Sequence, residues 1–131
     1  MNSYKKLTLV DDDEIFVFLT KKMIEQVKVI HLLNVFGNGL DALNFLRDKK
    51  NDADLLPEII LLDLSMPVLN GWQFLEEYTK LYPIFGKKII VYVCSSSISS
   101  TDINRAKSIN EVSDYVIKPI TIDKLRELVK F

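Results

Sequence analysis

The chain has 131 residues, of which 48% are hydrophobic, and this is the size and composition of one compact domain. Its 17 lysines and arginines nearly balance its 18 aspartates and glutamates, which leaves a formal net charge of −1. Because this charge produces little long-range field and the sequence contains no dense basic cluster, the composition argues against binding to nucleic acid or to an anionic membrane surface.

Neither a signal peptide nor a membrane-spanning segment is expected. Residues 1–6 lead directly into a short apolar run and lack the apolar core of a signal peptide. No apolar run approaches the roughly 18 to 20 residues that cross a bilayer. We therefore expect a cytoplasmic protein. The single cysteine, Cys94, excludes an internal disulfide and a cysteine-based metal cluster.

Five short apolar runs rich in valine, isoleucine and leucine predict five β-strands. The runs comprise residues 7–10, 29–36, 59–62, 89–94 and 115–117. Because most of them do not alternate between apolar and polar residues, we expect strands that are covered on both faces. Apolar residues at helical spacing predict a helix after each strand, with examples at Phe16, Leu19 and Met23, at Leu40, Leu43 and Leu46, at Phe74, Tyr78 and Leu81, at Ile103, Ala106 and Ile109, and at Ile122, Leu125 and Leu128.

This strict alternation of strand and helix predicts an α/β fold of the (βα)5 type. Right-handed crossovers then give a doubly wound, parallel five-stranded sheet, and we expect the flavodoxin-like strand order 2-1-3-4-5. The polar stretch 48–57 is expected to be a loop remote from the functional site. We expect one domain, residues 1–131, that ends with the fifth helix and has no output domain.

Polar side chains follow four of the five predicted strands. In chain order they are Asp11, Asp12 and Asp13, then Asp63, then Ser95, Ser96 and Ser97, and finally Lys118. Ligands of an open parallel sheet bind at the carboxyl ends of its strands, so these side chains should meet at one edge. Crowded carboxylates need a cation, and Mg²⁺ fits best because no histidine or cysteine here offers a softer ligand. A carboxylate beside Mg²⁺ can attack phosphorus and form an aspartyl phosphate, while a lysine and a serine hydroxyl bind the other phosphoryl oxygens.

Three motifs at these strand ends carry a family resemblance. They are Val10-Asp11-Asp12-Asp13, the stretch Leu62-Asp63-Leu64-Ser65-Met66-Pro67-Val68-Leu69-Asn70-Gly71, and the stretch Asp114-Tyr115-Val116-Ile117-Lys118-Pro119. In this order they resemble the receiver domain of response regulators, and the resemblance spans the whole chain.

The resemblance implies a role for each residue of the predicted site. It implies that Asp63 is the phosphoacceptor and that Asp11 and Asp12 form an acidic pair that binds Mg²⁺ together with Asp63. It implies that the backbone carbonyl of Ser65 is a further metal ligand. It also implies that Lys118 contacts the phosphoryl group.

The resemblance also implies a conformational switch. Ser95 would be the switch hydroxyl and Tyr115 the switch aromatic, which moves from an exposed to a buried position. Counting back from Lys118 favours Ser96 as the hydroxyl, whereas the position directly after the fourth strand favours Ser95. The switch would remodel the face formed by the fourth helix, fifth strand and fifth helix, whose outward residues are expected to be Asn104, Arg105, Lys107, Lys124 and Glu127.

The function that follows is a stand-alone response regulator of a two-component phosphorelay. Its phosphoryl donor would be a histidine kinase or a histidine phosphotransfer protein, and its target an unknown protein. It would catalyse its own phosphorylation and dephosphorylation without being an enzyme in the usual sense. A phosphatase of the haloacid dehalogenase type would need an aspartate where Ser65 stands, and a receiver fold without the switch would show a gap in the site residues.

Other polar or reactive residues have structural interpretations. Asp13 is expected to cap the first helix. His31 lies within the second strand, which is an edge strand, far from Asp63. Cys94 is expected to be a small buried hydrophobe. Trp72 could pack in the core or over the site.

Overall fold

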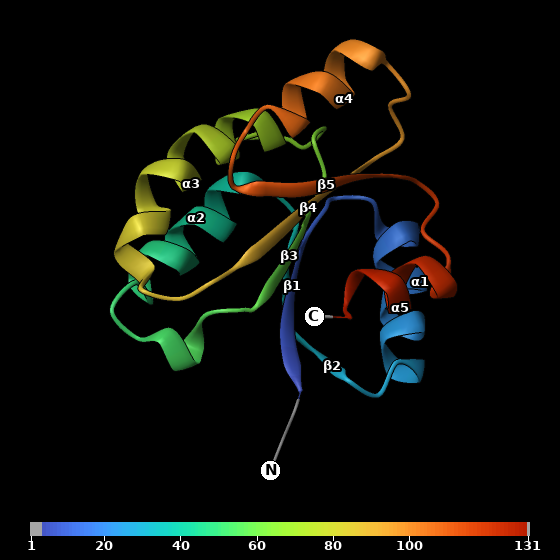
Figure 1. Cartoon of the computed structure of the whole chain (residues 1–131), viewed down its shortest axis with the longest axis horizontal. Helices are drawn as coiled ribbons and strands as arrows, with labels where there is room; N and C mark the ends of the chain where they lie inside the picture. Colours follow the sequence, from blue (N-terminus) through green and yellow to red (C-terminus); the bar gives the residue numbers. More distant parts are fainter. Residues whose placement is uncertain (1–3, 131) are drawn as a thin grey trace.

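The computed structural model describes residues 4–130, and within them five parallel strands form one sheet in the order β2-β1-β3-β4-β5 (Figure 1). The strands are β1 (Lys5–Val10), β2 (Ile30–Phe36), β3 (Ile59–Leu62), β4 (Ile90–Ser95) and β5 (Val112–Ile117). The predicted fold class and strand order are confirmed. The expectation of no signal peptide concerns residues 1–6, and residues 1–3 of this segment lie outside the described residues.

Five helices cover the two faces of the sheet. They are α1 (Glu14–Gln26), α2 (Gly39–Asp48), α3 (Gly71–Phe85), α4 (Ser100–Lys107) and α5 (Ile122–Leu128). Helices α1 and α5 pack on one face, and α2, α3 and α4 lie on the other (Figure 1). No helix in residues 4–130 combines the length and the apolar character needed to cross a membrane.

The central strand β3 anchors the fold. All four of its residues are buried, and they alternate between the two core layers. Ile60 and Leu62 pack with the layer under α2 and α3, while Ile59 and Leu61 pack with the layer under α1 and α5. Burying side chains of this size contributes about 1.5 to 3 kcal/mol each. The residue that follows β3 therefore extends from a fully buried strand at the centre of the sheet.

Four strands differ from their predicted bounds. β1 begins at Lys5 rather than at residue 7, and β2 begins at Ile30 rather than at residue 29. β5 begins at Val112 rather than at residue 115, because Ser113 and Asp114 stand on the partly exposed edge strand and break the apolar run. β4 includes Ser95, which was expected to follow it. The expectation that every strand is covered on both faces is wrong for β2, which is mostly half-exposed because it is the other edge strand.

The segment 48–57 lies at the amino edge of the sheet, away from the carboxyl ends of the strands, as expected. It contains the short 3-10 helix η1 (Ala53–Leu55). The ammonium of Lys87 donates a hydrogen bond to the Leu56 carbonyl (2.7 Å) and lies 2.6 Å from Glu58 Oε2. The backbone N–H of Lys6 donates to Glu58 Oε1 (2.6 Å). We call Lys6, Glu58 and Lys87 the amino-edge cluster.

Candidate phosphoryl and metal site

Three aspartates meet at the carboxyl edge of the sheet. Asp11 follows β1 and Asp63 follows β3, and the backbone N–H of Asp63 donates to the Val10 carbonyl (2.9 Å), so the two residues lie side by side. Asp11, Asp12 and Asp63 each offer a carboxylate oxygen, and these oxygens lie within 4.8 Å of one another. Asp11 and Asp63 are buried, whereas Asp12 is exposed. The aspartates that the sequence placed at this edge do come together.

Lys118 is the cation of this edge. It follows β5, and its backbone N–H donates to the Ser95 carbonyl (2.9 Å). Its Nζ lies 2.8 Å from Asp11 Oδ2 and 3.6 Å from Asp63 Oδ1. The ammonium also lies 4.3 Å from the centre of the Phe16 ring, whose face attracts a cation. We call Asp11, Asp12, Asp63 and Lys118 the acidic site.

Burial and crowding shift the pKa values of the acidic site. Burial, followed by repulsion from Asp11, raises the pKa of Asp63 to about 6, although Lys118 opposes the shift. Burial also raises the pKa of Asp11. Burial alone would lower the pKa of Lys118, but the two carboxylates outweigh it and the pKa is raised. Lys118 therefore stays protonated, and the carboxylates remain short of positive charge.

The side chains of the acidic site fit a hard divalent cation. Asp11 Oδ2 is buried, and the ammonium of Lys118 lies 2.8 Å from it as its ion-pair partner. One ammonium faces three carboxylates, and oxygen donors of this kind are those that Mg²⁺ prefers. The predicted acidic pair and Asp63 could therefore hold Mg²⁺. The backbone N–H of Ser65 donates a hydrogen bond to the Asp63 carboxylate, which lowers the pKa of Asp63 and so opposes the effect of burial. The role of the Ser65 carbonyl as a metal ligand stays a prediction.

Three consecutive serines, the last residue of β4 and the two that follow it, border the site on its other side. Ser95 is buried, and its Oγ accepts a hydrogen bond from the backbone N–H of Ser97 (3.1 Å), whereas Ser96 is exposed. An open pocket of about 400 Å³ is lined by these three serines together with Leu64, Ser65, Met66, Asn70, Trp72 and Asp102. The burial of Ser95 at the end of β4 favours it over Ser96 as the hydroxyl that faces the interior of the domain.

Tyr115 lies inward in this structure. Its ring is buried in the core layer under α3 and α4, and its hydroxyl donates to the Ser97 carbonyl (2.9 Å). Before the switch we expected Tyr115 to be exposed, whereas the structure has its side chain in the buried position. The side chains of β5 alternate between the two faces of the sheet, which directs Tyr115 toward this layer.

The remaining singled-out residues lie as follows. Asp13 caps α1, as predicted, because its Oδ1 accepts from the N–H of Ile15 (3.0 Å). Cys94 is free and buried, and burial raises the pKa of its thiol to about 12, which leaves it unreactive. Trp72 is half-buried and does both things considered for it, since it packs against the core and lines the pocket beside the serines.

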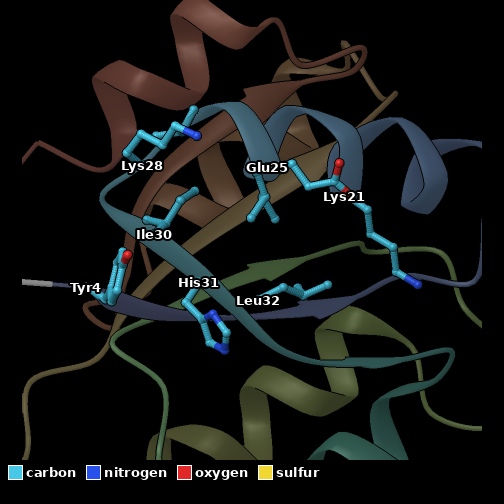
Figure 2. Close-up of a pocket in the computed structure, with 9 residues that line it drawn as sticks. Tyr4, Lys21, Glu25, Lys28, Ile30, His31 and Leu32 are labelled. Carbon is cyan, nitrogen blue, oxygen red and sulfur yellow. The ribbon is translucent and has the colours of Figure 1, made fainter.

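A separate hollow of about 600 Å³ lies at the opposite edge of the domain, between α1 and the start of β2 (Figure 2). His31 stands there on the exposed edge strand, with its ring centre 6.4 Å from that of Tyr4. The charged residues around the hollow, Lys21, Glu25 and Lys28, have mixed signs. The single histidine is thus far from the acidic site, as expected.

Two glycines of the site were not singled out from the sequence. A Cβ on Gly71 would lie 2.4 Å from the Asp63 carbonyl oxygen, and one on Gly39 would lie 2.5 Å from the Leu69 carbonyl oxygen. Both glycines follow an asparagine whose side chain caps the helix, Asn38 for α2 and Asn70 for α3. The repeated Asn-Gly pair was the available signal. It marks two helix starts that pack against the loop after β3.

Comparisons with known proteins agree with this geometry. The family model described as "Response regulator receiver domain" matches residues 7–130. The probable methanogenesis regulatory protein FilR2 of Methanothrix harundinacea is 29% identical over 124 residues, which cover 95% of this chain and 78% of FilR2. A two-component response regulator from Cytophaga hutchinsonii has a crystal structure with a TM-score of 0.84 and 30% identity, covering 96% of this chain and 94% of that one. The Mn²⁺-bound form of response regulator Rcp1 has a TM-score of 0.72 and 25% identity, covering 95% and 88%.

Several further curated relatives are longer than this chain. The chain spans between 11% and 50% of their lengths. The similarity thus concerns the receiver portion of those proteins.

Proposed function

This chain belongs to the response regulator receiver domain family, and from that premise we propose that Asp63 accepts a phosphoryl group from the phosphohistidine of a histidine kinase or a histidine phosphotransfer protein. The observation that carries the proposal is the position of Asp63. It follows the buried central strand, lies within 4.8 Å of two further carboxylates, and stands 3.6 Å from the ammonium of Lys118. Such a carboxylate is suited to act as a nucleophile toward phosphorus.

The chemical step needs an ionised Asp63. A pKa of about 6 leaves most of this carboxyl group ionised near neutral pH. One of its oxygens forms a bond to phosphorus while the phosphorus–nitrogen bond of the donor breaks. The imidazole leaves with that electron pair and takes up a proton from solvent. Lys118 would neutralise a phosphoryl oxygen, so that positioning and charge supply most of the rate enhancement.

Mg²⁺ is the proposed cofactor, held by Asp11, Asp12, Asp63 and the carbonyl of Ser65. When bound, it would supply positive charge that offsets both the crowded carboxylates and the incoming phosphoryl oxygens. The excess of three clustered carboxylates over the one ammonium of Lys118 supports this proposal. So does the similarity to response regulator Rcp1, whose structure is of a Mn²⁺-bound form.

We propose Ser95 as the switch hydroxyl. Its oxygen already accepts from the N–H of Ser97, so its proton is available to a new acceptor. A phosphoryl oxygen on Asp63 would be that acceptor, and this difference between the two states is what a population shift requires. Tyr115, whose hydroxyl donates to the Ser97 carbonyl, would sense the resulting movement of the loop.

Two serine variants test this assignment. Ser95→Ala should leave phosphorylation of Asp63 largely intact and reduce the phosphorylation-induced change in amide exchange over α4, β5 and α5. Ser96→Ala, its neighbour on the exposed side, is the matched control and should retain that change. If the two variants behave the other way round, Ser96 is the switch hydroxyl. If neither variant alters the change, the coupling does not use this segment.

The output surface is proposed to be the face of α4, β5 and α5. Asn104, Arg105, Lys107 and Glu127 are exposed there, and Lys124 is half-buried and lies 3.2 Å from Glu127. The partner is a protein target that the fold does not identify. We propose a cytoplasmic location, since the histidine of such a donor receives its phosphoryl group from cytoplasmic ATP. The expectation that no output domain accompanies these residues stays a prediction, which the mass of the native protein tests.

The decisive experiment uses a small phosphodonor, acetyl phosphate, and intact-mass spectrometry. With Mg²⁺ the mass should rise by one phosphate, about 80 Da, and without Mg²⁺ or in Asp63→Asn it should not. Asp54→Asn, which removes an exposed carboxylate from η1, is the matched control and should be labelled like the wild type. Absence of labelling in every protein would indicate a receiver fold that has lost the switch, and labelling of Asp63→Asn would exclude Asp63 as the phosphoacceptor.

A further inference from the structure

Helix α4 buries the fewest residues of the five helices in residues 4–130. Of its eight residues only Ala106 is buried, while Ile103 within the helix and Ile109 just beyond its end are partly buried against the core. Figure 1 shows α4 standing out from the body of the domain at the carboxyl edge of the sheet. With so few apolar contacts, one additional contact can decide where the helix lies.

Such a contact connects α4 with the start of α3. The guanidinium carbon of Arg105 lies 4.0 Å from the centre of the Trp72 ring. At this distance the cation is attracted to the face of the indole, which is the best aromatic partner for it. Trp72 also lines the pocket beside the serines that follow β4. The contact therefore joins α3 to α4 across one wall of the functional site.

Trp72 is held firmly on its side of the contact. It is the second residue of α3, whose first turn is fixed by a reciprocal pair of hydrogen bonds between Asn70 and Gln73. The N–H of Gly71 donates to the Leu64 carbonyl (3.0 Å), and a Cβ on this glycine would collide with the backbone of Asp63. The position of the indole is thus tied to the backbone of the proposed phosphoacceptor.

Arg105, in contrast, is connected to the loop after β4. It lies three residues beyond Asp102, about one helical turn. The carboxylate of Asp102 accepts a hydrogen bond from the hydroxyl of Ser97 (2.7 Å), and the N–H of Ser97 donates to Ser95 Oγ. A movement of Ser95 toward Asp63 would therefore shift the first turn of α4, and with it Arg105, while Trp72 stays in place.

We propose that stacking of Arg105 on Trp72 holds α4 in the described position and loosens when the segment from Ser95 to Ser97 moves toward a phosphorylated Asp63. The first half of the inference is that the contact holds α4, and the second half is that it loosens on phosphorylation. Only the second half rests on the proposed function. Arg105 is a positioning residue in this account, because it touches neither the phosphoryl group nor a metal ligand. The contact opposes the switch, and Trp72, the one tryptophan of the chain, reports on it.

The first half is tested without phosphorylation. Arg105→Ala should accelerate amide exchange in residues 103–109 by about two- to fivefold, the factor expected for losing an exposed cation–π contact. It should also make Trp72 more accessible to acrylamide quenching. Lys107→Ala is the matched control, since it removes a charge from the same helix but its ammonium lies 3.9 Å from Asp114 rather than on the indole. Arg105→Lys should retain part of the protection. Equal behaviour of the alanine variants at positions 105 and 107 would overturn the proposal.

The second half uses acetyl phosphate and Mg²⁺, with the intact mass measured on the same samples. Phosphorylation should change the Trp72 emission of the wild type and of Lys107→Ala, and Arg105→Ala should show less than about half of that change. Equal emission changes in labelled wild type and labelled Arg105→Ala would contradict the loosening. If no protein gains mass, the proposed function fails, whereas the comparison of the unphosphorylated variants still decides the contact.

Discussion

The two edges of the sheet combine the same kinds of charged group with opposite results. At the amino edge, the single carboxylate of Glu58 is satisfied by the ammonium of Lys87 and the N–H of Lys6. Burial alone would raise the pKa of Glu58, but these hydrogen bonds outweigh it and the pKa is lowered. At the carboxyl edge, Lys118 faces three carboxylates, and burial with repulsion raises the pKa of Asp63 to about 6.

The difference teaches how to separate a structural ion pair from a functional one. The one carboxylate of the amino-edge cluster is fully paired, and the ammonium of Lys87 also ties the segment before β3 to the loop before β4. The acidic site is short of positive charge, so its carboxylates are held close together at a free-energy cost until a cation binds. Excess like charge at a strand end, rather than the presence of an ion pair, marks the functional edge.

The largest expected effect is a difference in phosphorylation rate between variants of Lys118 at the carboxyl edge and Lys87 at the amino edge. Lys118→Ala should slow labelling by acetyl phosphate by about a hundredfold to a thousandfold, because it removes the charge that would meet a phosphoryl oxygen. Lys87→Ala should label at the wild-type rate. The rates are measured by time-resolved intact mass at saturating Mg²⁺. A rate for Lys118→Ala within about tenfold of the wild type would remove the proposed role of this lysine.

The next effect concerns Mg²⁺. At a hundredfold excess over its Kd, Mg²⁺ should stabilise the folded protein by about 2.7 kcal/mol, because it binds the folded acidic site and not the unfolded chain. Asp12→Asn should weaken this response while stabilising the metal-free form, since it relieves repulsion. Lys87→Ala should retain the full response. Thermal unfolding in EDTA and in Mg²⁺ measures it, and a melting temperature indifferent to Mg²⁺ would favour a receiver fold without metal chemistry.

A third prediction uses the opposite pKa shifts of the two edges. Folded Asp63 binds its proton more tightly than the unfolded chain does, so its ionisation destabilises the metal-free protein as the pH rises from about 4 through about 6. Asp63→Asn should therefore be more stable than the wild type by on the order of 2 kcal/mol at pH 8 and equal to it near pH 4.

Glu58 should show the reverse dependence. Its pKa is lowered in the folded state, so its stabilising effect is present above its ordinary pKa of 4.5 and is lost as the pH falls through the folded value. Glu58→Gln should be less stable than the wild type at pH 7, with a difference that shrinks in acid. Urea unfolding in EDTA across pH compares both variants with the wild type. If the stability difference from the wild type changed with pH in the same direction for Asp63→Asn and Glu58→Gln, the contrast between the two edges would be wrong.

The smallest effect is the structural worth of the amino-edge cluster. Lys87→Ala should lower the free energy of unfolding by about 1 kcal/mol, because the partly exposed ion pair with Glu58 is worth little and two carbonyl hydrogen bonds are modest. Chemical denaturation at pH 7 measures this loss. A loss as large as that caused by withdrawing Mg²⁺ would show that the amino-edge cluster stabilises the fold as strongly as the metal does, against the small value expected here.

The sequence was sufficient to predict which side chains meet at the carboxyl edge, because their meeting follows from topology. A parallel sheet brings the carboxyl ends of its strands to one edge, so Asp11, Asp63 and Lys118 needed only their places after apolar runs. Local hydrogen-bonding chemistry likewise predicted the cap at Asp13. In the core, the apolar run of β3 matched its strand residue for residue.

What the sequence missed depends on exposure and on side-chain direction. β5 starts three residues early because an edge strand tolerates polar residues such as Ser113, which hydropathy assigns to a loop. Strand alternation directs the Tyr115 ring inward, but the hydrogen bond of its hydroxyl to the Ser97 carbonyl joins residues 18 positions apart, which no periodicity encodes. The amino-edge cluster joins Lys6, Glu58 and Lys87, which are far apart in the sequence. In the sequence each of them is indistinguishable from an ordinary charged surface residue, because only the folded sheet brings them together.

The most direct test of the central claim is to locate the phosphoryl group. The protein is labelled with acetyl phosphate and Mg²⁺, the acyl phosphate is reduced with borohydride to homoserine, and the peptides are sequenced by mass spectrometry. The account predicts homoserine at Asp63 and unmodified aspartate at Asp11, Asp12 and Asp54. Homoserine at any of those three aspartates, with Asp63 unmodified, would contradict it.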